Sequence, residues 1–456
     1  MTPTVATYFS ARPDPTGPSD AVDGAVATVR ARSSRDLLAA VPYLLGYRPR
    51  ESLVVVCVGA RGTVDLVVRV ALDDLHLAGA VRDRASDPVG RLVAALHRTS
   101  ATDLLIAVHT AREPSTFRPR VEPVLAALER VADVEPWLVS PHGYRGLDCD
   151  DAACCPPEGH PPTDLEHRAV NAALVVAGCA VADSPEDAYR IRPAPEPCRA
   201  RAARAATRAE RAGRAHDVER DAEPGAGRDA ECGAERGGAP DVAGGAAARA
   251  RRRTAGYDLW CELVRHAARE ADAGPPGAAA LPPARLGRLA VALGDLAVRD
   301  AVLLSLVPGG EDVARRTASA RPGPGSRVPA SSARGAHPSP DGPPGPGAGE
   351  DAADGGVEAA TARAVARVVD PRVAVVPDPA VARSATLVLE QVVAHVPRRR
   401  HAPALTLLAF LAWWQGDGGR AAHRLQEATS ADTGYRLAAL LGAVLDAGVP
   451  PGWVRS

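Results

Sequence analysis

The chain has 456 residues, a formal net charge of −1 and an aromatic content of only 3%. This length suits two or more domains, and a net charge near zero provides no overall field that would attract nucleic acid or a membrane. The sequence contains no lysine, so all 54 basic residues are arginines. The standard forms of P-loop NTPases, protein kinases and pyridoxal-phosphate enzymes each need a lysine and are therefore excluded.

The segment from Ser33 to Asp74 predicts a helix followed by a β-hairpin. Leucine and valine recur at helical spacing after a capping serine, while Pro42 predicts a kink or an early stop and Gly46 suits the position after a helix end. A continuous β-branched run then predicts a strand buried on both faces. The strand, the turn and the returning strand are expected at 53–58, 59–62 and 64–72.

Helices and strands alternate in the next part of the chain, which is the order of an α/β sandwich. Right-handed crossovers would make these strands parallel, and the first hairpin would make the sheet mixed. Thr163 and Glu166 form a capping box that predicts one helix reaching Ala177, and Ser184 caps a short helix that begins at Pro185. The other expected elements are a helix at 88–99, a strand at 103–108, a helix at 120–131, a strand at 134–139 and an edge strand at 144–148.

Three stretches of the sequence resemble a known family. They are LLAAVPYLLGYRPRESLVVV at 37–56, the cysteine segment CDDAACCPPEG at 149–159, and the tail at 408–418 together with 437–441 and 447–451. These stretches are similar to the actinobacterial family called domain of unknown function 4192. The resemblance covers most of the chain outside two low-complexity ranges, and it implies no catalytic residue, because the family has no established activity.

Composition divides the chain into six parts. Two of them are poor in large apolar residues and are expected to stay unfolded or to act as linkers. The parts are a flexible arm at 1–30, an α/β domain with a mixed sheet and flanking helices at 31–190, a disordered Ala/Arg/Gly-rich insert at 191–253, a helical segment at 254–307, a Pro/Gly-rich linker at 308–356 and a helical C-terminal domain at 357–456. Within the helical segment, Thr254 is predicted to cap a helix.

The C-terminal domain predicts four helices that pack closely. Asp378 and Pro379 mark the start of the first helix, which is expected to end near His395. Ala409, Ala421 and Ala428 are the small residues expected where two antiparallel helices approach each other. The spacing resembles a tetratricopeptide helix hairpin, but the interpretation that we favour is a plain helical subdomain packed on the α/β core, because repeat folds need about three units.

The densest group of reactive side chains is the cysteine segment. Cys149, Cys154 or Cys155, and His160 could supply three of the four ligands of a zinc site, although the usual Cys-x2-Cys spacing is missing and two adjacent cysteines rarely share one metal. A second interpretation pairs Cys149 with Cys154 in a reversible disulfide. We favour a third, in which the loop is structural and cysteine serves as a small hydrophobic residue.

The remaining candidates are single side chains or short runs. Asp103 and His109 bracket a strand, and His109 is expected near the carboxyl edge of the sheet, where α/β proteins bind ligands. Arg48, Arg50 and Glu51 precede the first strand and are interpreted as a solvated loop rather than an anion site. Arg299 and Asp300 predict a charge pair at a packed interface, and Trp413 and Trp414 predict core packing. The arginine runs at 249–253 and 398–400 are interpreted as solvated rather than as nucleic-acid contacts.

These observations favour a non-enzymatic interaction or regulatory module that binds a protein partner through its helical tail. The alternative is an α/β ligand-binding protein or enzyme with a thiol or metal site at Cys149–Cys155, for which zinc would be the suited ion. Nucleic acid is not expected as a partner. The first residues lack a basic start and an apolar core, and no apolar run is long enough to span a bilayer, so a cytoplasmic location with reduced thiols is expected.

Overall fold

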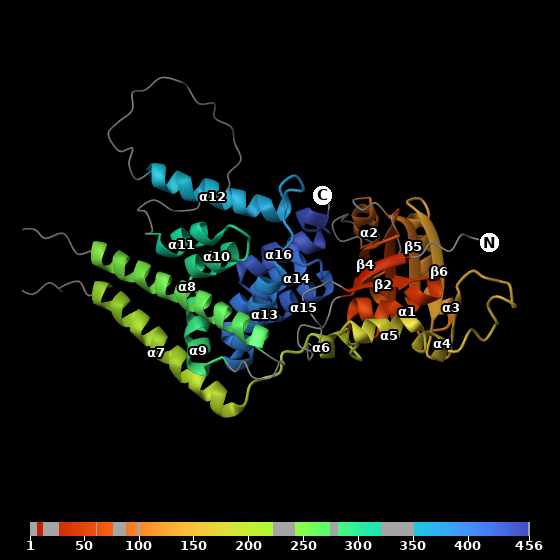
Figure 1. Cartoon of the computed structure of the whole chain (residues 1–456), viewed down its shortest axis with the longest axis horizontal. Coiled ribbons are helices and arrows are strands. Elements are labelled where there is room, and N and C mark those ends of the chain that lie inside the picture. The colour runs from red at the N-terminus through yellow and green to blue at the C-terminus, as the bar shows by residue number, and fades with distance from the viewer. Residues whose placement is uncertain are drawn as a thin grey trace, which may run out of the picture.

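The computed structural model describes residues 7–11, 27–60, 62–75, 88–97, 101–221, 242–273, 281–320 and 351–454. Figure 1 shows an α/β domain built from the first part of the chain beside a larger all-helical domain built from the rest. The two domains meet at Tyr189, whose ring lies 5.9 Å from that of Tyr47 in the α/β domain and 5.3 Å from that of His423 in the helical domain. The predicted fold class, a mixed α/β domain followed by helices, is confirmed.

The α/β domain is organised around a five-stranded sheet in the order β4-β3-β5-β6-β7. Its strands are β3 (Ser52–Gly59), β4 (Val64–Ala71), β5 (Ala101–His109), β6 (Asp133–Val139) and β7 (Tyr144–Gly146). Only β5 and β6 run parallel, and the other neighbouring pairs are antiparallel. The mixed sheet and the edge position of β7 match the predictions.

Helices cover both faces of this sheet. Val54, Val56 and Leu105 pack on one face against α1 (Ser34–Leu45) and α5 (Ala169–Val176). Leu53, Val55 and Ile106 pack on the other face against α2 (Pro88–Leu96) and α3 (Pro114–Leu128). Every residue of β3 is buried, as its β-branched run predicted.

Two local predictions in this domain are wrong, and one of the two alternatives at Pro42 is excluded. Pro42 does not stop α1 early, because the helix continues to Leu45 before Gly46 adopts a left-handed φ of 80°. The Thr163 capping box does not form, because Pro162 occupies the N-cap position of a single-turn helix, α4 (Thr163–Glu166), that is separate from α5. Ser184 caps α6 (Pro185–Ala188) as predicted. Within the predicted flexible arm, β1 (Thr7–Ala11) pairs with β2 (Ala27–Ala31).

The helical domain encloses one large apolar core that includes Tyr257, Leu289, Val388 and Trp414. Its helices are α7 (Glu196–Asp221), α8 (Val242–Ala273), α9 (Pro283–Ala292), α10 (Leu296–Ser305), α11 (Glu311–Ser319), α12 (Asp351–Val369), α13 (Pro379–His395), α14 (His401–Trp414), α15 (Gly418–Ala431) and α16 (Arg436–Asp446). Short 3-10 turns lie at Leu72–Asp74, Arg398–Arg400 and Gly452–Val454. None of the helices that the structure describes is long and apolar enough to cross a membrane.

The helical domain begins well before residue 254. The range 191–253, predicted as a disordered insert, contains α7 and the first part of α8, so Thr254 lies inside a helix and does not cap one. The predicted linker at 308–356 likewise contains α11 and the start of α12. Alanine accounts for the error, because its small side chain buries little area but lets helices approach closely. Residues 222–241 and 321–350 of these two ranges lie outside the described residues.

The C-terminal helices follow the predictions closely. The Asp378 side chain caps α13 by accepting hydrogen bonds from the backbone N–H groups of Ala380 and Val381. Ala409, Ala421 and Ala428 are completely buried where α14 and α15 pack together. These helices share their core with α8 and α9, whereas the favoured interpretation had placed them on the α/β core. The tetratricopeptide likeness stays a prediction.

Candidate functional site

The cysteine segment forms a tight loop at the open edge of the sheet, immediately after β7. Its first half is a turn in which the Asp151 carbonyl accepts from the N–H groups of Cys154 and Cys155 at 3.0 and 2.7 Å. Its end returns to the sheet, where His160 and Tyr144 exchange backbone hydrogen bonds of 2.9 and 2.8 Å. Both ends of the loop are therefore fixed by backbone hydrogen bonds, and the cysteines lie between them.

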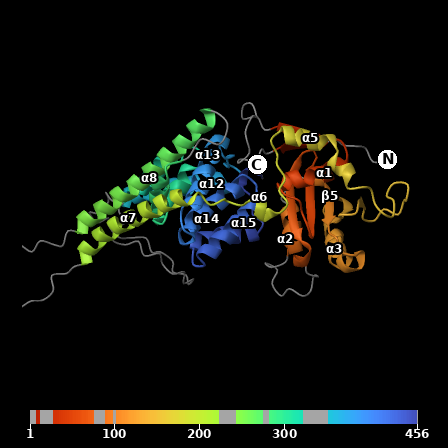
Figure 2. The same cartoon turned by 90° about the horizontal axis from the view of Figure 1, so that it is seen from below.

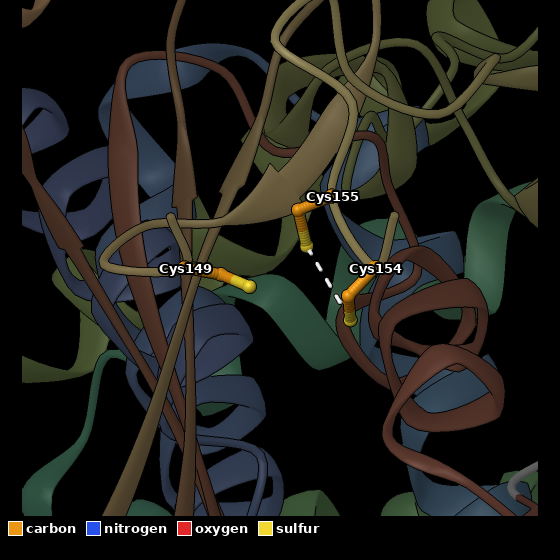
Figure 3. Close-up of side chains that lie close together, drawn as sticks. All are labelled: Cys149, Cys154 and Cys155. Atoms are coloured by element: carbon orange, nitrogen blue, oxygen red, sulfur yellow. Dashed lines mark hydrogen bonds between the residues drawn. The ribbon is translucent and has the colours of Figure 1, made fainter. Parts of the chain in front are cut away.

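The three predicted cysteines converge. The Sγ atoms of Cys149, Cys154 and Cys155 all lie within 4.8 Å of one another, and Figure 3 shows the side chains lying close together. Cys155 is buried, Cys149 is half-buried and Cys154 is exposed, and none of the three is in a disulfide. The Cys155 sulfur accepts from the Gly146 N–H at 3.4 Å and lies 4.0 Å from the Cys154 sulfur.

The backbone at Gly146 leaves no room for a side chain. A Cβ atom there would lie 2.9 Å from the Cβ of Cys149 and 3.6 Å from the sulfur of Cys155. Glycine at this position therefore permits the strand end to approach the cysteine loop and draws Cys149 towards the other two thiols.

The crowding of three thiols opposes their ionisation. The hydrogen bond with Cys155, followed by the charge of Cys155 and the contact with Cys149, raises the pKa of the Cys154 thiol above its usual value. A cation placed among the sulfurs would reverse this effect, because a coordinating thiol is deprotonated by the metal. The raised pKa opposes a role for Cys154 as a reactive nucleophile, which needs a lowered thiol pKa.

His160, which the sequence offered as one possible metal ligand, does not join the three sulfur atoms. Its Nε2 atom lies 2.8 Å from the Cys154 carbonyl oxygen and 2.9 Å from an Arg35 guanidinium nitrogen, and its ring lies 5.2 Å from that of Tyr144. These contacts orient the loop against α1 and the sheet. A metal held by the three cysteines would need its remaining ligand from another source.

The sulfur positions are close to those that a zinc ion requires. A Zn–S distance of about 2.3 Å with tetrahedral angles places two sulfurs on one ion about 3.8 Å apart. The observed limit of 4.8 Å is about 1 Å larger, and Cys154, the exposed member of the three, is the one least held by packing. Within the residues that the structure describes, these cysteines are the group whose donor atoms converge in this way.

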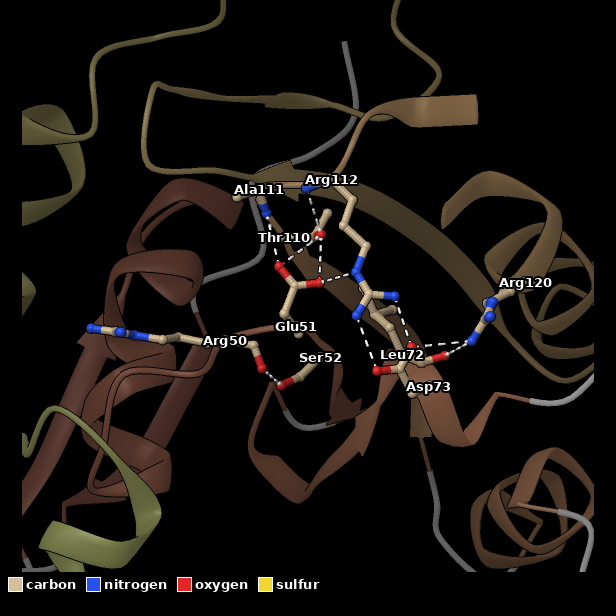
Figure 4. Close-up of polar contacts among 9 residues, drawn as sticks. All are labelled: Arg50, Glu51, Ser52, Leu72, Asp73, Thr110, Ala111, Arg112 and Arg120. Carbon is tan, nitrogen blue, oxygen red and sulfur yellow. Dashed lines mark hydrogen bonds and ion pairs between the residues drawn. The ribbon is translucent and has the colours of Figure 1, made fainter. Parts of the chain in front are cut away.

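A second polar cluster lies where β4 and β5 end and β3 begins (Figure 4). The Glu51 carboxylate accepts from the Thr110 hydroxyl at 3.0 and 3.1 Å, from the Ala111 N–H at 3.1 Å and from the Arg112 guanidinium at 2.7 Å. Arg112 also donates two parallel hydrogen bonds to Asp73, at 2.7 and 3.0 Å. The interpretation of Glu51 as part of a solvated loop is therefore wrong.

This cluster is internally satisfied. The hydrogen bonds from Arg112 lower the pKa of Asp73, and Asp73 in turn raises the pKa of Arg112. Arg120 adds a further contact of 3.2 Å to Asp73. Glu51 has a positive φ of 44°, which is uncommon outside glycine, and hydrogen bonds from three donors, Thr110, Ala111 and Arg112, hold it in place. The cluster ties three strand ends together, and its polar groups are already paired.

Sequence reasoning missed Asp73, Thr110, Arg112 and Arg120. A usable signal was present, because Asp73 follows the second predicted strand and Thr110–Arg112 follows the third. Side chains placed just beyond the carboxyl ends of neighbouring parallel strands gather at one edge of a sheet. Here β4 and β5 both run antiparallel to β3, so their ends reach the same edge.

His109 and Asp103 stand at opposite ends of β5 and do not form a site together. His109 is buried at the carboxyl edge, where burial lowers its pKa to about 4 and its Nε2 atom has no hydrogen-bond partner among the described residues. Asp103 instead accepts from the Thr102 hydroxyl at 2.7 Å. His109 is therefore neutral at physiological pH.

The other predicted contacts are mostly structural. Arg299 and Asp300 form the expected pair at 2.6 Å, and Trp413 and Trp414 are buried in the core. The interpretation of the two arginine runs as solvated holds only in part. Arg253 pairs with Asp295 at 2.9 Å, and Arg400 pairs with Glu210 at 2.6 Å.

A family model described as Domain of unknown function (DUF4192) matches residues 35–321 and 333–452. The chain belongs to this family. No curated protein and no solved structure matches it. The DUF4192 match includes the α/β domain, the cysteine loop and the C-terminal helices, so the geometry described above lies within the family region. The family description names no activity.

Proposed function

We propose that the protein is an interaction module whose α/β domain holds a thiophilic metal ion, zinc foremost, at Cys149, Cys154 and Cys155. The observation that carries this proposal is the convergence of three unbridged sulfur atoms within 4.8 Å. The ion has a structural role: it fastens the loop between β7 and His160 to the open edge of the sheet. Structural zinc contributes folding free energy directly, because the unfolded chain has no preformed site.

A metal site agrees with the geometry better than a disulfide does. A disulfide needs two sulfurs about 2.05 Å apart and leaves the third thiol without a role. Cys149 and Cys154, the pair predicted as a possible disulfide, are not bridged, and the Cys155 sulfur lies within the same 4.8 Å limit. Three thiols gathered around one point suit a single ion that all of them can reach.

Cobalt(II) titration of the reduced protein tests this proposal. Thiolate ligation of cobalt gives an intense sulfur-to-metal absorption band, and we expect this band to saturate at one equivalent and to be displaced by zinc. The Cys154→Ser variant should weaken the band and lower the affinity by more than the roughly 10-fold to 100-fold that loss of an outer-shell partner costs, because Cys154 is itself a ligand in this proposal. Cys198→Ser is the matched control, since Cys198 is a half-buried thiol on α7, away from the loop. No band in the wild-type protein, or equal loss in both variants, would contradict the proposal.

We further propose that the helical tail binds a protein partner. The observation that favours this role is Leu440, a 61% exposed leucine on α16, next to a shallow groove between α15 and α16 lined by Ala439, Gly442 and Ala443. Affinity capture with the full chain, followed by reconstitution with the purified partner, should show binding that Leu440→Asp removes. Leu296→Asp, at a 63% exposed leucine on α10, should leave it intact. Equal binding by both variants would contradict this role.

A further inference from the structure

Alanine side chains form the face by which helix α7 packs on the rest of the helical domain. Ala202, Ala205 and Ala206 are buried where α7 packs against α9. A Cβ atom added to Gly287 of α9 would lie 2.1 Å from the Ala202 carbonyl oxygen, so the two backbones are in direct contact. Such a contact fixes the rotation of α7 about its own axis, and therefore also fixes which side chains face outward.

Glu210 provides a second anchor for α7. Its carboxylate accepts two hydrogen bonds from Arg400, at 2.6 and 3.1 Å, and the Arg400 side chain is only 8% exposed. This carboxylate is therefore directed toward the domain and away from the outer face of α7. Glu196 and Glu210 are the acidic residues in the first 19 positions of the helix, 196–214.

The outward face of α7 is a stripe of arginines. Four exposed residues repeat at helical spacing and lie on one side of the helix, which we call the arginine stripe: Arg201, Arg204, Arg208 and Arg211. At a rise of 1.5 Å per residue, the stripe is about 15 Å long. Arg199 and Arg214 are also exposed, but at helical spacing they lie on other sides of α7 and are not part of the stripe. Figures 1 and 2 both show α7 beside α8, at the side of the helical domain away from the α/β domain.

The stripe carries positive charge that the described structure does not neutralise. None of its four side chains forms an ion pair or a hydrogen bond with another described residue. Like charges three or four residues apart destabilise a helix by a few tenths of a kcal/mol per pair. The chain tolerates three such pairs in succession on a helix whose opposite face is locked, and an external polyanion would supply the missing negative charge.

We propose that the arginine stripe of α7 binds the phosphate backbone of nucleic acid. Along about 15 Å of a DNA duplex, each strand presents about four phosphates, and arginine binds phosphate through two parallel N–H groups. The residues beside the stripe are mainly alanine, and the Thr207 hydroxyl donates to the Ala203 carbonyl at 3.0 Å. No amide or aromatic side chain lies among residues 196–214, so this face has no group that reads base edges. Binding is therefore independent of sequence.

This proposal changes the expectation that nucleic acid is not a partner. The net charge of −1 concealed the stripe, because acidic residues elsewhere balance it in the total. The prediction of disorder at 191–253 also concealed it, since arginines in an unfolded segment have no common face. Only the helical register of α7 brings the four side chains into line.

The test uses the full chain and a labelled DNA duplex of mixed sequence, followed by fluorescence anisotropy at several salt concentrations. One variant replaces Arg201, Arg204, Arg208 and Arg211 with glutamine. The control variant replaces four other exposed arginines with glutamine, so that its net charge changes equally: Arg130, Arg363, Arg372 and Arg383. Circular dichroism confirms that both variants retain their helices.

We expect the stripe variant to bind at least roughly tenfold more weakly, and the slope of log K against log salt to become shallower by about 3.6, or 0.9 for each lost phosphate contact. The control should keep most of the wild-type affinity, and duplexes of different sequence should bind alike. Equal weakening of both variants would show a general charge effect and overturn the proposal, as would undetectable wild-type binding. Stripe-dependent binding to phosphatidylserine vesicles but not to the duplex would assign the stripe to a membrane surface and overturn it as well.

Discussion

Arg400 and Glu210 lie 190 positions apart in the chain, and the Arg400 guanidinium donates two hydrogen bonds to a single Glu210 carboxylate oxygen. The pair joins the start of α14 to the middle of α7, a helix that composition alone assigned to a disordered insert. It shows why the helical domain extends as far back as residue 196, and several predictions depend on this long-range packing.

Removing the partner of Arg400 should destabilise the helical domain. Glu210→Gln leaves a guanidinium whose side chain is only 8% exposed without its counter-charge. Because the Glu210 side chain is partly exposed to solvent, we expect a loss of about 1–3 kcal/mol in the free energy of unfolding, measured by urea denaturation. Glu196→Gln, at an exposed position of the same helix, should change the stability by less than about 0.5 kcal/mol. Equal effects would show that the pair does not contribute.

Two glycine substitutions test the close approach of α7 to α9. Gly287→Ala would force its methyl group against the Ala202 carbonyl, so we expect a loss of at least about 1–3 kcal/mol from overpacking. Gly213→Ala, on α7 with no atom within 4 Å of the new Cβ, should stabilise the helix by about 0.5–1 kcal/mol. Thermal unfolding measures both changes. A stable Gly287→Ala protein would mean that α7 is not seated directly on α9.

His109 should make the α/β domain sensitive to acid. Burial lowers its folded-state pKa to about 4, below the ordinary value of 6.5, so the folded protein binds this proton less readily than the unfolded chain does. The stability that the neutral, buried His109 ring contributes to the folded protein is therefore fully present above pH 6.5 and is lost as the pH falls from 6.5 towards 4. The difference between the folded-state pKa and the ordinary value corresponds to about 3 kcal/mol in the free energy of unfolding.

The His109→Leu variant isolates this effect. Its stability should change less between pH 7 and pH 4 than that of the wild-type protein, when both are measured by denaturant unfolding across the pH range. Proton NMR of the His109 ring gives the pKa directly. A measured pKa near 6.5 would contradict the buried, uncharged state described here.

In the polar cluster where β4 and β5 end and β3 begins, the ionisation of Asp73 should depend on Arg112. Hydrogen bonds from Arg112 hold the pKa of this carboxyl group below its usual value. Arg112→Ala should therefore raise the pKa of Asp73 towards the ordinary range, which carboxyl NMR titration can follow. Arg118→Ala removes a nearby arginine that instead contacts Glu122 and Asp148 and should leave Asp73 unchanged. Identical titrations in the wild-type and Arg112→Ala proteins would show that the pair does not persist in solution.

Sequence patterns predicted those helices and strands whose local sequence preference agrees with the packing that they have in the fold. The β-branched run of β3, the edge strand β7 and the capped helix α13 all have strong signals within a few residues. Helix α7 lacked such a signal, because alanine and arginine provide no large apolar face. What stabilises its position is contact with Gly287 and Arg400, both far away in the chain.

The candidate site was likewise predictable only in part. The cysteines are close in sequence, so their proximity followed from spacing, whereas His160 is also close in sequence but turns toward Arg35 and the Cys154 carbonyl. The partners of Glu51 come from the ends of two other strands and could be found only after the sheet order was known. The arginine stripe likewise depends on a helical register that composition does not reveal.

The metal content of the protein tests the central proposal most directly. The full chain is purified under reducing conditions without chelator, and bound metals and free thiols are counted on the same sample. We predict one equivalent of zinc, and we expect Cys149 and Cys154, the accessible thiols of the loop, to react with a thiol reagent in the folded protein only after a chelator is added. Cys154→Ser protein should lose most of the zinc. A metal-free wild-type protein in which Cys149 and Cys154 react equally fast with and without the chelator would contradict the proposal.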